Sequence, residues 1–137
     1  MQNEPPFVDA NIFLDVARRR KGWKASAAAL TEIKKINGFV SSLTVAIVYF
    51  IKLRTTSPLK ARQETRELIQ GLRIAAVTSE VINQALDNTA IEDFEDGIQF
   101  YCARTAAKVI VTRNKRDYAA VEKELQVVTP EQFLAKL

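Results

Sequence analysis

The chain contains no histidine and only one cysteine, Cys102, among its 137 residues. The absence of histidine excludes the Ser-His-Asp and Cys-His nucleophile arrangements and the common zinc sites. A single cysteine excludes an internal disulfide bond and fits a reducing compartment. If the protein is an enzyme, carboxylates must carry its chemistry, with or without a metal ion.

Glycine and long apolar runs are also scarce. With four glycines, the sequence contains neither of the Gly-rich loops that bind nucleotide phosphates. The longest apolar run, VAIVYFI, is too short to span a bilayer, and the N-terminus lacks the regions of a signal peptide. A chain of this length is typical of one domain. We therefore expect one cytoplasmic domain, residues 1–137, without a membrane segment.

Basic residues outnumber acidic residues by 20 to 16 and gather in three groups along the chain. They lie in the segments ARRRKGWK, IKLRTTSPLKARQETR and TRNKR. One such group is typical of an ordinary solvent-exposed surface. Three groups on a small basic chain favour a polyanionic partner.

Short apolar runs of β type alternate with helix-type segments. The pattern predicts strands at 6–10, 39–42, 73–78, 108–112 and 126–129. It predicts helices at 11–19, 24–36, 42–54, 59–72, 79–86, 94–107, 116–125 and 130–137. Segment 42–54 is ambiguous, and its length favours a helix. This alternation indicates an α/β fold, a three-layer α/β/α sandwich with a mostly parallel central sheet.

Acidic side chains follow the ends of predicted strands. Asp9 ends the first strand, Asp117 follows the fourth with Asn114 between, and the stretch IEDFEDG opens a late helix. In such sheets these positions meet at the carboxyl edge, where ligands bind. Converging carboxylates repel each other unless a cation lies between them. Oxygen ligands without His or Cys select Mg²⁺ or Mn²⁺, and such an ion suits phosphodiester hydrolysis.

Each acid also has a simpler interpretation. Asp93 and Asp96 are spaced to cap a helix and complement its dipole, and residues 89–92 form a capping-box pattern. Asp9 fits an Asx-turn and Asp117 a helix N-cap, while Glu92 and Glu95 fit positions that cap a helix or face water. From spacing alone, these local roles are favoured over a metal site.

Three motifs resemble the PIN-domain family in their order and spacing, especially small prokaryotic VapC-like toxins. They are FVDANIFLDV, SSLTVAIVYFIKLR and IEDFEDGIQFYCARTAAKVIVTRNKRDY. The resemblance implies a PIN-like sandwich and an Mg²⁺- or Mn²⁺-dependent ribonuclease that acts on RNA. It also implies a cognate antitoxin as partner, and a homodimer.

The resemblance further implies the residues of the site. Metal ligands would be Asp9 and Asp96, with Asp93 adding to the acidic pocket, and Asn114 and Asp117 would complete the catalytic set. Small polar residues in the same cleft would support them, namely Asn11 and Thr112. We interpret the basic residues beside Asn114 as contacts to the RNA backbone, namely Arg113 and Lys115.

The sequence departs from the family pattern at one position. An acid expected after the second strand falls on Ile47, and no carboxylate occurs between Gly38 and Gln63. Two hypotheses follow: a ribonuclease that works with one ion, or a catalytically degenerate PIN-fold module that binds RNA or protein.

Overall fold

The computed structural model of the protein describes residues 4–137, so residues 1–3 of the expected domain lie outside the described residues. Five parallel strands form one sheet in the order β3-β2-β1-β4-β5. They are β1 (Phe7–Val8), β2 (Phe39–Ser41), β3 (Arg73–Ala75), β4 (Val109–Val111) and β5 (Gln126–Val128). The predicted parallel sheet and α/β/α class are confirmed.

Seven α-helices and one 3-10 helix alternate with these strands within residues 4–137. They are α1 (Ala10–Arg18), α2 (Trp23–Lys35), α3 (Ser42–Leu53), α4 (Pro58–Ile69), α5 (Ser79–Asp87), α6 (Phe94–Ala106), η1 (Lys115–Val121) and α7 (Pro130–Ala135). The ambiguous segment 42–54 is helical, as its length predicts. No helix described in residues 4–137 is long and apolar enough to cross a membrane.

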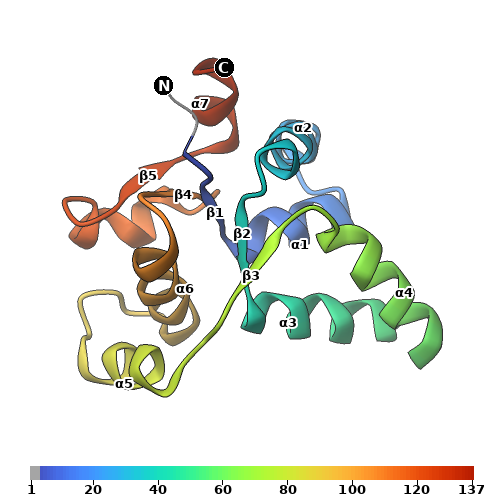
Figure 1. Ribbon diagram of the computed structural model, residues 1–137, viewed down its shortest axis with the longest axis horizontal. Coiled ribbons are helices and arrows are strands. Elements are labelled where there is room, and N and C mark those ends of the chain that lie inside the picture. The colour runs from blue at the N-terminus through green and yellow to red at the C-terminus, as the bar shows by residue number, and fades with distance from the viewer. Residues whose placement is uncertain (1–3) are drawn as a thin grey trace.

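Two hydrophobic cores cover the two faces of the sheet. Phe7 of β1 packs with α5, α6 and η1, whereas Val8, the next residue, packs with α1, α2 and α3. Ile110 and Val111 of β4 divide between the two cores in the same way. Successive side chains of a strand point to opposite faces, so even these short strands build both cores. Figure 1 shows α5 and α6 on one side of the sheet and α1 to α4 on the other.

Side chains at the helix starts explain where several helices begin. Ser41, Ser57, Thr78, Asp93 and Thr129 each accept a hydrogen bond from a backbone N–H of the first helical turn. Such a bond satisfies one of the N–H groups that have no partner within the helix. The caps therefore fix the residues at which α3 and α6 begin.

Two local predictions are wrong. Residues 89–92 do not form the capping box of α6, because the helix begins later and Asp93 is its N-cap. The helix expected at 116–125 is the 3-10 helix η1, and Asn114 rather than Asp117 precedes it. Tyr118 and Val121 both point into the core, and residues three apart lie one above the other in a 3-10 helix. Packing therefore favours the tighter helix.

Cys102 lies on the buried face of α6. Burial raises the pKa of its thiol to about 11, and its Sγ lies 3.6 Å from the carbonyl oxygens of Ala75 and Ala76. A thiol with so high a pKa is protonated at neutral pH and reacts slowly. Cys102 is therefore a packing residue.

Candidate active site

The first half of the candidate site lies where β1 and β4 end side by side. Asp9 follows β1 and Thr112 follows β4, and the two strands are neighbours in the sheet. One oxygen of Asp9, Oδ2, accepts hydrogen bonds from Thr112 Oγ1 at 2.7 Å and from the Tyr118 hydroxyl at 3.0 Å. Asp9 is only 1% exposed. The carboxylate is therefore held in one orientation by side chains from distant parts of the chain.

Asn11 joins the turn after β1 to the turn after β4. Its Nδ2 donates to Asp9 Oδ2 at 3.2 Å and to Thr112 Oγ1 at 3.0 Å. Its Oδ1 accepts from the backbone N–H of Arg113, and Thr112 Oγ1 accepts from the backbone N–H of Asn114. These bonds fix the loop that carries Asn114 relative to Asp9.

The second half of the site lies at the N-terminus of α6. Carboxylate oxygens of Asp93, Glu95 and Asp96 lie within 4.8 Å of one another. Asp93 accepts a hydrogen bond from the backbone N–H of Asp96, and Asp96 is 9% exposed. These acids, Asn114 and Asp117 line a pocket of about 800 Å³.

The electrostatics of the site connect its two halves. Burial raises the pKa of Asp96 to about 7, and the charges of Asp9, Asp93, Asp117 and Glu95 add to this increase. Burial also raises the pKa of Asp9, although hydrogen bonds from Thr112 and Tyr118 act in the opposite direction. The pKa of Glu95 is raised by burial and then by Asp9 and Asp93. Two of these carboxylates, Asp9 and Asp96, are buried, and the more exposed Asp93 and Glu95 lie close to Asp96.

Within residues 4–137, no ion pair joins these acids to a lysine or arginine. Carboxylates that repel each other in a poorly solvated place favour a bound cation. The available ligand atoms are oxygens, which suits a hard divalent cation such as Mg²⁺ or Mn²⁺. The residues that could hold such an ion are Asp9, Asp93, Glu95 and Asp96.

The structure does not bring Arg113, one of the two predicted RNA contacts, to the acidic pocket. Its guanidinium lies 2.6 Å from Glu131 and 3.3 Å from Asp15. It also donates to Ser26 Oγ and to the carbonyl oxygen of Gly22. Burial would raise the pKa of Glu131, but hydrogen bonds from Arg113, Thr129 and the backbone, together with the charge of Arg113, hold that pKa below its ordinary value. Internal contacts therefore occupy Arg113.

Lys115, the other predicted RNA contact, lies beside the acidic pocket rather than within it. Its Nζ donates to Gln132 Oε1 at 3.4 Å, in a separate groove along β5. Its role as an RNA contact stays a prediction. By contrast, Asp9, Asn11 and Thr112 form one half of the site, and Asp93, Asp96, Asn114 and Asp117 line the other.

Sequence reasoning missed two residues of the arrangement. Glu95 was expected to cap the helix or face water; it is partly exposed, and its carboxylate also lies in the cluster with Asp93 and Asp96. Tyr118 is fully buried and donates to Asp9, although it stands 109 positions away. Its place in the motif VTRNKRDY was the only signal in the sequence that could have pointed to it.

Ile47 lies on α3, one helical turn beyond Thr44, and is partly exposed. Thr44 Oγ1 accepts a hydrogen bond from Gln99 Nε2, and Gln99 is one turn beyond Asp96 on α6. Residues three apart share a helix face. This hydrogen bond joins the first turn of α3 to α6, and position 47 lies one turn further along α3.

The fold and site define a three-layer α/β protein with an acidic site at the carboxyl edge of a parallel sheet. A PIN domain model matches residues 7–116, and the chain belongs to the PIN domain family, as the sequence motifs predict.

Two solved structures resemble the protein over most of its length. One is a toxin–antitoxin complex from Klebsiella pneumoniae, with a TM-score of 0.68 and 20% identity, covering 91% of this chain and 97% of that chain. The other is VapBC2 from Rickettsia felis bound to a DNA fragment from their promoter, with a TM-score of 0.66 and 14% identity, covering 90% and 96%. At these identities the likeness shows the fold. No curated protein matches the chain.

Proposed function

We propose that this protein is a metal-dependent endoribonuclease of PIN type and the toxin of a toxin–antitoxin pair. The observation that carries the proposal is the group of carboxylates at the carboxyl edge, where burial and mutual repulsion raise the pKa values of Asp9, Glu95 and Asp96. Membership of the PIN family supports the nuclease class. The likeness to two toxin–antitoxin structures supports an antitoxin as partner. The proposal includes one cytoplasmic domain that forms a homodimer.

In the proposed reaction, the protein positions the oxygen ligands, and a bound cation would favour their charged form, which burial alone disfavours. Thr112, Tyr118 and Asn11 orient Asp9, while the start of α6 presents Asp96 with Asp93 and Glu95. A bound Mg²⁺ or Mn²⁺ would supply Lewis acidity toward a phosphate oxygen and a more acidic water. Asn114 and Asp117, which line the same pocket, would orient the attacking water or the phosphate.

Purified protein should cleave single-stranded RNA when Mn²⁺ is present and should stop when a chelator is added. The physical reason is that the carboxylates need a cation both to lose their repulsion and to act on a phosphate. The measurement is the appearance of RNA fragments on a denaturing gel. Asp9→Asn, purified in the same way, should show no cleavage. Equal cleavage by both proteins would reveal a contaminating nuclease and overturn the proposal.

The second candidate function is a degenerate PIN module that binds RNA or protein without cleaving it. Ile47 favours it, because this side chain offers no ligand atom where the family places an acid. Under this alternative, titration calorimetry should show no saturable Mn²⁺ binding to the unmodified protein.

Ile47→Glu should strengthen Mn²⁺ binding by about tenfold or more, since it adds a carboxylate where the family pattern places an acid, one helical turn beyond Thr44. The affinity is measured by titration calorimetry, followed by RNA cleavage. Ala46→Glu is the matched control, because it adds the same charge on the exposed surface of the same helix. If both variants bind Mn²⁺ as the unmodified protein does, position 47 does not face the site.

A further inference from the structure

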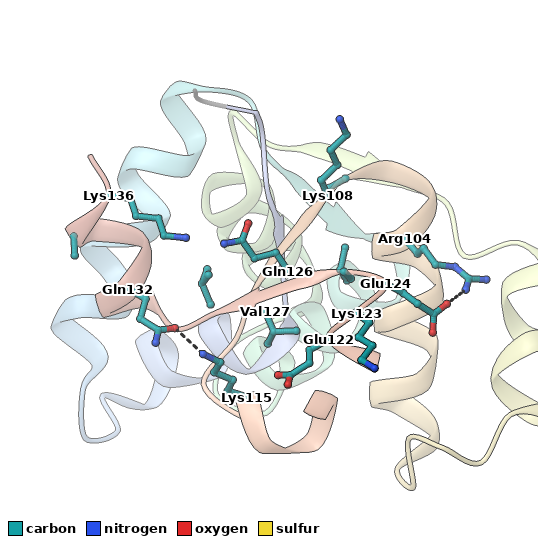
Figure 2. Close-up of a pocket in the computed structure, with 14 residues that line it drawn as sticks. Arg104, Lys108, Lys115, Glu122, Lys123, Glu124, Gln126, Val127, Gln132 and Lys136 are labelled. Atoms are coloured by element: carbon teal, nitrogen blue, oxygen red, sulfur yellow. Dashed lines mark hydrogen bonds and ion pairs between the residues drawn. The ribbon is translucent and has the colours of Figure 1, made fainter. Parts of the chain in front are cut away.

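A second concavity runs along β5, the last strand of the sheet. It has a volume of about 1100 Å³ and lies between the end of α6, the segment before β5, and α7. Figure 2 shows its charged side chains around Gln126 and Val127. We call it the β5 groove. Its lining contains two acids, Glu122 and Glu124, and five basic residues, Arg104, Lys108, Lys115, Lys123 and Lys136.

Most of the positive charge in the β5 groove is available to a ligand. Arg104 is paired with Glu124 at 2.6 Å. Lys123 and Lys136 have no ion-pair partner among the described residues, 4–137, and Lys115 donates only to the neutral Gln132. The partner of Lys108 is Glu4, and both side chains are largely exposed, so this pair is weak. The groove thus carries an excess of positive charge that fits an anionic ligand.

One end of the β5 groove meets the candidate active site. Lys115 lines the groove, while its neighbours Asn114 and Arg116 line the acidic pocket, so η1 separates the two by a single ridge. At the same end, the backbone N–H of Thr112 donates to the carbonyl oxygen of Val128, the last residue of β5. Thr112 is also the residue that hydrogen-bonds Asp9. A chain lying in the groove would therefore lead directly to the acids.

We propose that the β5 groove holds the sugar–phosphate backbone of the RNA strand whose scissile phosphate lies in the acidic pocket. This inference rests on the proposed ribonuclease function for the identity of the strand. Lysines bind phosphates as point charges, which carries no sequence information. No aromatic side chain lines the groove, so it has no platform on which bases would stack. The groove therefore binds without regard to base sequence.

The main chain of β5 argues against an acidic peptide as the occupant. Gln126 donates its backbone N–H to Lys108, and Val128 accepts from Thr112, so both face β4. In a three-residue parallel strand this leaves only Val127 with its N–H and C=O directed outward. A peptide added to this edge would gain very few main-chain hydrogen bonds. A second copy of the chain is also disfavoured as the occupant, because pairing the β5 edges of two copies would bring two positively charged grooves together.

The test measures binding of a short fluorescent RNA by anisotropy in the Asp96→Asn background, which prevents cleavage. The triple variant K108E/K123E/K136E should weaken binding at least about tenfold and reduce the salt dependence, because phosphate contacts release counterions. The control K34E/K35E/R73E changes net charge equally at positions outside the groove and outside the three basic groups, and it should change affinity by less than about threefold. Thermal melting checks that both variants are folded.

Each outcome separates the groove from the proposed function. If the two triple variants weaken RNA binding equally, or if neither weakens it, the proposal that the β5 groove binds RNA is wrong. Its lysines would then serve to protect an open sheet edge from pairing with another chain. If a poly-glutamate peptide competes with the RNA and binds more tightly than the RNA does, RNA is the wrong occupant and the groove binds an acidic protein partner. Single-stranded DNA bound equally well would show that the groove recognises phosphodiesters in general and would overturn the restriction to RNA. If the unmodified protein binds RNA through the groove but does not cleave it with Mn²⁺, only the ribonuclease proposal fails.

Discussion

Asp96→Asn should make the metal-free protein more stable at about pH 8 and at the same time remove its stabilisation by Mn²⁺. Burial and four neighbouring acids raise the pKa of Asp96 to about 7. The folded state therefore bears the cost of a charge that an amide of the same shape does not carry. After allowance for solvent screening, we expect a gain on the order of 1–2 kcal/mol.

The pH dependence of this gain has a definite sign. A carboxyl group with a raised pKa binds its proton in the folded state at pH values where the unfolded chain has lost it. Between the ordinary value of 3.8 and about 7, the unmodified protein should therefore lose stability as the pH rises. Below this range the carboxyl group is protonated in both states, and the advantage of Asn should disappear.

Thermal melting at about pH 8 and about pH 5, with a chelator or with Mn²⁺, measures both effects. Asp87→Asn is the matched control, because it makes the same change at an exposed acid that lies outside both the carboxylate cluster and the acidic pocket. RNA cleavage should fall about 100-fold or more in Asp96→Asn and little in the control. A metal response in Asp96→Asn equal to that of the unmodified protein would exclude Asp96 as a ligand.

Arg113→Ala should destabilise the protein by about 3 kcal/mol, since it leaves the buried carboxylate of Asp15 without its cation. Asp15 is buried beside Ser26, and Arg113 joins α1, α2 and α7 through Asp15, Ser26 and Glu131. Removing one partner of a buried ion pair costs more than removing an exposed charge. Chemical denaturation monitored by circular dichroism measures the change in the free energy of unfolding.

Lys115→Ala is the control. Among residues 4–137 its side chain donates a hydrogen bond only to Gln132, so its loss should leave stability within about 0.5 kcal/mol. The two variants thereby separate the roles that the sequence predicted for both residues. If the Arg113→Ala protein is as stable as the unmodified chain but binds RNA less tightly, Arg113 contacts RNA and its structural role is excluded. A stable Lys115→Ala protein that binds RNA less tightly would fit the β5 groove.

Much of the fold could be predicted from the sequence because its signals are local. Alternating strand residues such as Phe7 and Val8 must serve two cores, and β-α alternation then requires a parallel sheet with helices on both faces. Asp9 could be placed at the carboxyl edge for the same reason, since it follows β1 directly. The failures at residues 89–92 and in η1 concern where a helix starts and how tightly it winds, which neighbouring packing decides.

The sequence by itself determined which residue types the site can use. Acids follow the strands, histidine is absent, and an isoleucine stands at position 47. Only the tertiary structure decided the partners of those residues. Tyr118 reaches Asp9 across 109 positions, and Arg113, basic like Lys115, is turned into an internal network. Charge and spacing are properties of the chain, whereas burial and direction depend on which elements pack together. That is why the same basic motif supplies one structural arginine and one lysine in an open groove.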